Sequence, residues 1–155
     1  MEKATFAAGC FWGVEARFRE IPGVISASVG YTGGQVAKPS YGQVCTGLTG
    51  HAEAVEIIYD EKNISYEELL QHFWNMHDPT SINRQGPDFG TQYRSAIFYH
   101  TEEQRKAAFA SKEKLEKSNR FKKSIVTEIQ PISEYYKAED YHQQYYAKHK
   151  KRLFL

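Results

Sequence analysis

The spacing of apolar residues predicts alternating strands and helices in the first part of the chain. A short apolar run at residues 4–8 indicates a strand, and apolar side chains then recur at helical spacing over residues 11–21, until Pro22 ends the pattern. Residues 24–31 alternate between apolar and polar side chains, which is typical of a half-buried strand. The expected apolar face of that strand consists of Ile25, Ala27, Val29 and Tyr31.

The middle of the chain holds a long polar loop between two strands, followed by a helix. The loop spans residues 35–50, and strand character resumes at residues 51–60. Loops of this length in compact domains are often functional. Residues 65–78 follow the pattern of an amphipathic helix, and Ser65 with Glu68 forms a capping box at its start.

The last part of the chain continues the alternation. The predicted elements are a loop at 82–92, a strand at 93–100, a charged helix at 101–118 and a strand at 125–132. The Tyr-rich tail begins at Ser133, and we expect Tyr141 and Tyr145 to lie four residues apart on one helix.

This order of elements, β-α-β-β-α-β followed by α, β and α, predicts an α+β fold. We expect a two-layer ferredoxin-like (split βαβ) sandwich with a C-terminal extension, formed by residues 1–155 as one domain. A chain of this length buries roughly 70% of the surface that it exposes when unfolded, so it needs no disulfide framework.

Charge and cysteine content exclude several classes of protein. Twenty Lys and Arg residues against nineteen Asp and Glu residues leave a formal net charge of +1, so we expect neither nucleic acid nor a membrane as a partner. The stretch "FAAGC" looks like a lipoprotein attachment box, but it comes too early to follow the apolar region of a signal sequence. Two cysteines, Cys10 and Cys45, without a Cys/His metal pattern favour a reducing, cytoplasmic location and no bound metal.

Cys10 is a candidate nucleophile. It lies where the first strand meets the first helix, and unpaired N–H groups at a helix N-terminus favour the thiolate. An ordinary thiol has a pKa of about 8.5, which such a position lowers. The alternative is a small buried side chain, because free Cys is among the residues most often buried.

Glu53 and His51 are the candidates for proton transfer. Glu53 is in phase with the apolar positions of its strand, so burial is expected to raise its pKa and to make it a proton donor. The alternative is a solvated Glu at the strand edge. For His51, hydrogen bonds to the backbone are favoured over a role as catalytic base.

Several aromatic and polar side chains stand close to these residues in the sequence or in neighbouring loops. Tyr41 and Tyr93 offer phenolic hydrogen-bond donors, while Phe11 and Trp12 offer an aromatic wall. Asp88 can orient a tyrosine or bind a polar group, although an Asp in such a loop is most often a turn residue.

Five ordered motifs resemble the A-type peptide-methionine sulfoxide reductases. They are "GCFWGVE", "GYTGG", "YGQVCTGLTGHAE", "HDPTSINRQGPDFGTQYRSAIFY" and "AEDYHQQYY". The likeness runs from about Phe6 to Tyr146 and implies a single catalytic domain that reduces the S epimer of methionine sulfoxide, free or in oxidised proteins, to methionine. It implies no metal and no bound organic cofactor.

The resemblance also implies roles for residues at matching positions. Cys10 corresponds to the nucleophile that attacks the sulfoxide sulfur and becomes a sulfenic acid, and Glu53 to the acid that protonates the oxygen. Tyr41 and Tyr93 correspond to phenols that hydrogen-bond that oxygen. The residues implied to bind the substrate are Phe11 and Trp12, against the S-methyl group, and Asp88, as a supporting polar residue.

One feature departs from the family pattern. Many members carry recycling cysteines in a C-terminal tail, whereas the stretch "KHKKRLFL" holds none and Cys45 is the only other thiol. We expect a monomeric enzyme whose Cys10 sulfenic acid is reduced by an external thiol, either thioredoxin or glutathione with glutaredoxin. Two other readings remain, a cysteine hydrolase that pairs Cys10 with His51, and a peptide-binding module without chemistry.

Overall fold

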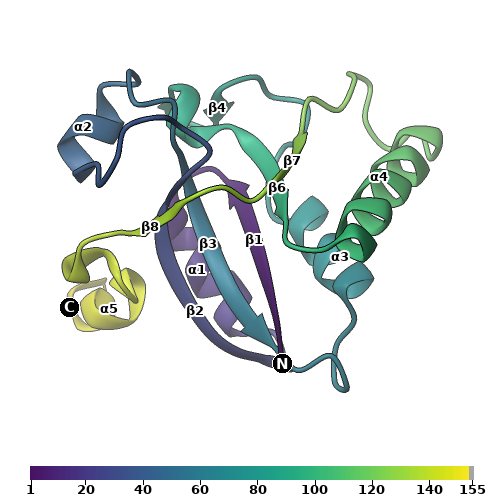
Figure 1. Cartoon of the computed structure of the whole chain (residues 1–155), viewed down its shortest axis with the longest axis horizontal. Helices are drawn as coiled ribbons and strands as arrows, with labels where there is room; N and C mark the ends of the chain where they lie inside the picture. Colours follow the sequence, from purple (N-terminus) through teal and green to yellow (C-terminus); the bar gives the residue numbers. More distant parts are fainter. Residues whose placement is uncertain (154–155) are drawn as a thin grey trace.

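A curled sheet of six strands runs through the molecule (Figure 1). The computed structural model describes the backbone of residues 1–153 and the side chains of residues 1–149. The strand order is β7-β6-β1-β3-β2-β8, in which β6 and β7 are parallel and the other neighbours are antiparallel. The strands are β1 (Glu2–Ala8), β2 (Val24–Thr32), β3 (Ala52–Tyr59), β6 (Ser95–Tyr99), β7 (Glu128–Pro131) and β8 (Tyr135–Lys137).

Five helices and a small hairpin complete the described part of the chain. The helices are α1 (Phe11–Arg19), α2 (Tyr41–Cys45), α3 (Tyr66–Asn75), α4 (Glu102–Lys117) and α5 (Tyr145–Leu153). The hairpin consists of β4 (Arg84–Gln85) and β5 (Asp88–Phe89), and two 3-10 turns are η1 (Thr91–Tyr93) and η2 (Asp140–His142). Among these helices, none is both long enough and apolar enough to cross a membrane.

The main core lies between the sheet and helices α1 and α3. Phe6 of β1 is fully buried, and its ring stacks at 5.2 Å on Phe18 of α1 and at 5.2 Å on Phe73 of α3. The opposite face of the sheet carries a second, smaller cluster, in which the small side chains of Ala7 and Ala54 lie with Phe98, and Ile132 packs against it. This alternation of large and small residues fixes which face of each strand meets the helices.

The predicted α+β class is confirmed, and most elements lie where the sequence places them. Ser65 caps α3 through a capping box with Glu68, as expected, and Thr101 accepts a hydrogen bond from the Gln104 N–H at the start of α4. β1 and β2 each pair antiparallel with β3, which lies between them. The ferredoxin-like description of this arrangement stays a prediction.

Three local expectations are wrong. Ile25 is 55% exposed, because a register shift between Val24 and Ser26 turns it away from the apolar face of β2. The loop at residues 35–50 contains helix α2, which a capping box formed by Ser40 and Gln43 stabilises. Tyr141 belongs to η2 and not to the helix that begins at Tyr145, so the two do not share a helical face.

Candidate active site

The turn between β1 and α1 presents Cys10 at the N-cap position of the helix. Gly9 makes this turn possible, because its φ of +99° lies in the left-handed region that favours glycine. A Cβ at that position would also lie 2.9 Å from Cβ of Gln85, in the hairpin that borders the site. Cys10 is partly exposed and is not part of a disulfide.

Opposing effects act on the Cys10 thiol. Burial raises its pKa, the N–H groups of Trp12 and Gly13 at the start of α1 lower it, and the negative charges of Glu53 and Asp88 raise it further. The resulting pKa is about 11. The expectation of a lowered thiol pKa is therefore wrong, because burial and two carboxylates outweigh the helix N-terminus. Cys10 is a neutral thiol in the free protein at neutral pH.

Glu53 lies on β3, and its side chain extends from the sheet toward the first turn of α1. Its side chain is 1% exposed, and Oε1 accepts a hydrogen bond from the backbone N–H of Phe11 at 3.1 Å. Since Phe11 directly follows Cys10, the carboxyl group lies at the turn that carries the thiol, close enough for its charge to raise the thiol pKa. Burial raises the pKa of Glu53 to about 8, although the bond from Phe11 lowers it, and the charge of Asp88 adds to the increase. The expected burial and raised pKa of Glu53 are confirmed.

Tyr41, Tyr93 and Asp88 lie around this pair. Tyr41 begins α2, and Tyr93 ends η1. Burial raises the pKa of both phenols, that of Tyr93 to about 12, and the charge of Glu53 contributes to both increases. Charge on Asp88 also raises the pKa values of Cys10 and Glu53. The structure therefore brings these five polar side chains close enough for their charges to interact.

The two aromatic residues after Cys10 differ in their surroundings. The Phe11 ring is 1% exposed and packs 5.7 Å from the ring of Tyr31 and 5.2 Å from that of His142. Trp12 is partly exposed and stacks on Tyr145 at 3.8 Å with an interplanar angle of 8°. Its Nε1–H donates to Nδ1 of His142 at 3.0 Å. Phe11 thus belongs to the packed interior, while Trp12 keeps part of its surface accessible.

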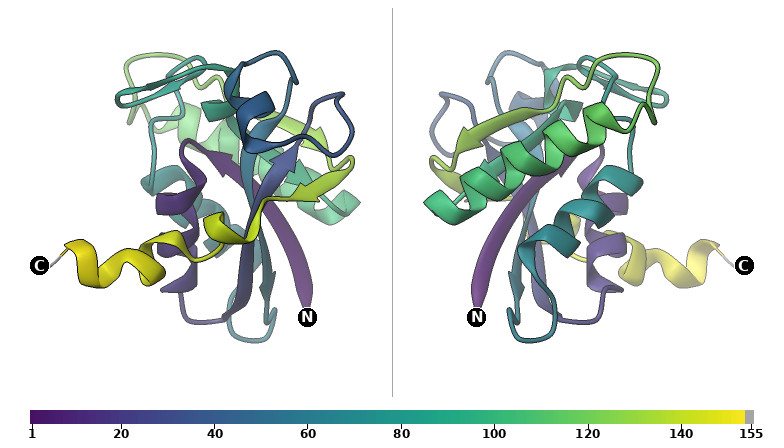
Figure 2. Two further views of the ribbon diagram at one scale, coloured as in Figure 1. Left: turned by 90° about the vertical axis from the view of Figure 1, so that its left-hand side faces the viewer. Right: turned by 90° about the vertical axis from the view of Figure 1, so that its right-hand side faces the viewer.

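A C-terminal segment, residues 138–144, packs against the site, although none of its residues is a predicted site residue. Figure 2 shows the C-terminal part of the chain, in yellow, crossing in front of α1 in the left view. Glu139 accepts hydrogen bonds from the Tyr31 hydroxyl at 2.8 Å and from the Tyr41 N–H at 3.0 Å. Glu15, buried on α1, accepts the Gln144 N–H at 2.8 Å. The signal in the sequence was the motif "AEDYHQQYY", whose polar residues make these contacts.

His51 has a structural position. It is 2% exposed, its Nε2 lies 2.7 Å from the Val36 carbonyl oxygen, and its Nδ1 accepts the Gly34 N–H at 3.0 Å. The expected hydrogen bonds to the backbone are therefore confirmed, and both ring nitrogens are occupied. Cys45, at the end of α2, is exposed and free of disulfide bonds.

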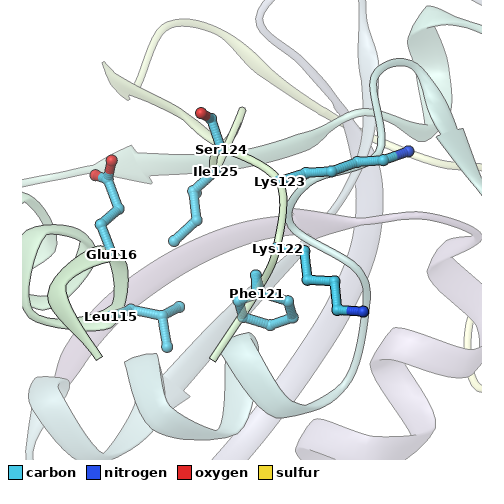
Figure 3. Close-up of a pocket in the computed structure, with 7 residues that line it drawn as sticks. All are labelled: Leu115, Glu116, Phe121, Lys122, Lys123, Ser124 and Ile125. Atoms are coloured by element: carbon cyan, nitrogen blue, oxygen red, sulfur yellow. The ribbon is translucent and has the colours of Figure 1, made fainter. Parts of the chain in front are cut away.

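Cys10 opens onto a groove of about 360 Å³ that follows one side of α1. Gly13, Arg17, Met76 and Tyr146 form part of its lining, so an external molecule can approach the sulfur from this side. A separate pocket of about 180 Å³ lies beyond the end of α4, where Leu115 and Ile125 line it (Figure 3). None of the site residues lines that second pocket. Within the described residues, no group of three or more His, Cys, Asp or Glu side chains could hold a metal ion.

Comparisons with known proteins agree on one family. A family model of peptide methionine sulfoxide reductases matches residues 2–154. A peptide methionine sulfoxide reductase MsrA of Methanosarcina acetivorans is 65% identical over 148 residues, covering 96% of this chain and 79% of the relative.

Solved structures lead to the same family. The reduced form of Mxr1 from Saccharomyces cerevisiae superposes with a TM-score of 0.91 at 39% identity, covering 97% of this chain and 86% of that one. Mxr1 in complex with Trx2 superposes with a TM-score of 0.67 at 28% identity, covering 93% of this chain and 84% of that one. The chain belongs to the MsrA family of peptide methionine sulfoxide reductases, which are oxidoreductases acting on sulfur.

Proposed function

We propose that the protein reduces the S epimer of methionine sulfoxide, free or in oxidised proteins, to methionine, with Cys10 as nucleophile and Glu53 as proton donor. The observation that carries this proposal is the buried Glu53 carboxyl, held 3.1 Å from the N–H of the residue after Cys10 and with a pKa of about 8. A sulfoxide oxygen is a poor leaving group until it is protonated. A carboxylic acid that stays neutral at pH 7 supplies that proton, and such a step typically contributes about 10² to 10⁴ in rate.

The reaction balances with the thiol and the acid alone. The Cys10 sulfur attacks the sulfoxide sulfur while Glu53 protonates the oxygen, and the oxygen is transferred to Cys10 as a sulfenic acid when methionine leaves. The proton that the thiol loses restores the neutral Glu53. Sulfur in the sulfoxide is reduced, and the sulfur of Cys10 is oxidised by the same two electrons.

Tyr41 and Tyr93 stabilise charge on the oxygen in this proposal. Both phenols keep their protons at neutral pH, since the pKa of an ordinary tyrosine is about 10 and burial raises theirs further. Each can therefore donate a hydrogen bond to the oxygen while negative charge develops on it. Trp12, with Phe11 behind it, forms the wall against which the S-methyl group packs, and Asp88 supports the polar side of the site.

An external thiol completes the cycle. The sulfenic acid of Cys10 and two thiol groups give back the Cys10 thiol, a disulfide and water. Mxr1 forms a complex with Trx2, which supports thioredoxin as the source of those thiols here. Glutathione with glutaredoxin is the other candidate. Cys45 does not stand at a recycling position of the family pattern, so we assign it no part in this step.

We place the reaction in a single catalytic domain, residues 1–155, that acts as a monomer in the cytoplasm. The repair of oxidised methionine in proteins is the role that follows from this chemistry.

Separate incubation with the S and R epimers tests the function. With dithiothreitol under anaerobic conditions, we expect the wild-type protein to release methionine from the S epimer, and the Cys10→Ser variant to release none. Activity on the R epimer alone, or turnover by Cys10→Ser, would contradict the proposal.

A further inference from the structure

His142 occupies the centre of an aromatic cluster beside the site. The residue is completely buried. Its ring centroid lies 5.2 Å from that of Phe11, 5.7 Å from that of Trp12 and 4.4 Å from that of Tyr41. The ring centroid of the neighbouring Tyr141 lies 4.0 Å from that of His142. One imidazole therefore contacts three of the aromatic residues to which the proposed function gives a role.

The hydrogen bond between Trp12 and His142 defines the state of the imidazole. An indole N–H can only donate, so Nδ1 of His142 must accept, and the proton of the neutral ring lies on Nε2. An imidazolium has N–H groups on both nitrogens and cannot accept this bond. Burial lowers the pKa of His142, although Glu139 acts in the opposite direction, so the neutral form is present at neutral pH.

The surroundings of Nε2, the second ring nitrogen of His142, indicate why a histidine occupies this position. Nε2 of His142 is buried and has no hydrogen-bond partner within the described part of the chain. By contrast, both ring nitrogens of His51 and of His77 lie within hydrogen-bond distance of partners. An unpartnered buried N–H is unfavourable, and an apolar side chain of similar size would avoid it. The acceptor at Nδ1 is therefore the reason for a polar residue at this position.

We propose that His142 is a positioning residue that holds the Trp12 indole in place through Nδ1, and thereby fixes the wall that recognises the S-methyl group of the substrate. This inference rests on the proposed function, because it concerns the same site. His142 does not touch the reacting atoms in this proposal; it acts through Trp12.

The segment that carries His142 is itself anchored on both sides. Gln143 accepts the Val29 N–H at 2.9 Å and donates to the Val29 carbonyl at 2.9 Å, which ties the segment to β2. Glu139 bonds the Tyr41 N–H. His142 is thus attached to the sheet and to α2, and it can transmit their rigidity to an indole that is otherwise held mainly by stacking.

Variants at position 142 distinguish the acceptance of the Trp12 hydrogen bond from side-chain packing alone. In His142→Asn, Oδ1 takes the place of Nδ1 and still accepts from Trp12, whereas His142→Leu fills the space without an acceptor. We expect His142→Leu to raise KM for the S epimer about fivefold to tenfold, as for the loss of one buried hydrogen bond, with a smaller change in kcat. His142→Asn should stay within about threefold of the wild type.

Substrate selectivity gives a readout that a purely structural role would not change. An S-ethyl group is one methylene larger than S-methyl, and a well-fixed pocket discriminates such a difference by about tenfold or more. We expect His142→Leu to reduce the preference for methionine sulfoxide over ethionine sulfoxide, and His142→Asn to retain it. In a Trp12→Phe background, His142→Leu should have little further effect, because the donor is already absent.

The outcomes distinguish the two proposals. If the wild-type protein releases no methionine, the proposed function fails. If it is active and His142→Leu, folded by circular dichroism, has wild-type KM and selectivity, the positioning role is overturned. Equal losses in His142→Leu and His142→Asn, or additive losses with Trp12→Phe, would also overturn it.

Discussion

Replacement of Glu53 by Gln removes the transferable proton while it preserves the shape of the site. The amide oxygen of Gln can still accept the Phe11 N–H that Glu53 now accepts at 3.1 Å. Loss of general-acid catalysis typically costs about 10² to 10⁴ in rate, so we expect kcat for methionine sulfoxide to fall by that factor in Glu53→Gln. Single-turnover formation of methionine, measured by rapid quench, reports the chemical step directly.

The pH dependence provides a sharper test than the rate alone. The reactive pair needs a protonated Glu53, with a pKa of about 8, and an ionised Cys10, with a pKa of about 11. This is the reverse of the order in which the two groups lose protons. Between these pKa values one proton remains on the pair, and a difference of three units places it on the carboxyl in only about one molecule in 10³.

The wild type and Glu53→Gln should therefore differ in the pH profile of kcat/KM, which reports pKa values of the free enzyme. In the wild type, kcat/KM should rise with pH and level off above the Glu53 pKa of about 8. In Glu53→Gln only the thiol titrates, so the residual activity should continue to rise toward the Cys10 pKa. Removal of the Glu53 charge also lowers the pKa of Cys10. The rise of kcat/KM in Glu53→Gln should therefore be governed by a pKa between the wild-type values of Glu53, about 8, and Cys10, about 11.

Stability measurements check that the carboxyl is as buried as its contacts indicate. The pKa of Glu53 is raised from 4.5 to about 8 on folding. The associated stability is fully present below pH 4.5 and is lost as pH rises through the folded-state pKa, a total on the order of 5 kcal/mol. Glu53→Gln has no carboxyl to ionise at this position, so it lacks this loss. Between about pH 4 and pH 9, the free energy of unfolding, measured with urea, should therefore fall less in Glu53→Gln than in the wild type.

Glu53 would not be the proton donor if Glu53→Gln had wild-type turnover, or if kcat/KM rose with pH in the same way in Glu53→Gln and in the wild type. In either case another group would be the source of the proton. Unchanged relative stability at the two pH values would show that the carboxyl is solvated in solution.

Three further substitutions test the surroundings of the pair. Tyr41→Phe and Tyr93→Phe should each lower kcat by up to about 10²-fold with little change in KM, because each removes one donor to the developing charge; a loss confined to KM would contradict that role. His51→Asn should lower the thermal unfolding temperature but leave kcat of the folded protein unchanged, because both ring nitrogens of His51 bond backbone groups. Abolished turnover would instead favour a mechanism in which Cys10 is paired with His51. Cys45→Ser should keep full activity with dithiothreitol, and the intact mass of the wild type after one equivalent of substrate should show a sulfenic acid, not a disulfide with Cys45.

Local sequence patterns were sufficient for most of the secondary structure. Capping by Ser65 and Thr101 marks the starts of α3 and α4, because each side chain satisfies a backbone N–H of its own helix. The same signal at Ser40 marks α2, within a stretch whose polar composition instead predicts a loop. The phase error at Ile25 has a different origin, since a register shift depends on how β2 pairs with β3.

The tail shows where local patterns stop being informative. Tyr141 and Tyr145 have helical spacing, yet a 3-10 turn ends at His142 and a new helix begins at Tyr145. The break follows from tertiary contacts: the Gln144 N–H bonds Glu15 of α1 in place of a helical carbonyl. Hydrophobic and helical periodicity contain no information about such distant partners.

The sequence by itself determined the α+β class, the family motifs and the burial of Glu53, because alternation along one strand decides which side chains face the core. Only the tertiary structure decided the protonation state of Cys10, since a thiol pKa depends on desolvation and on charges contributed by other elements. It alone brought His142 against Trp12, across 130 residues of sequence. Contacts of that kind arise from packing, which no local pattern encodes.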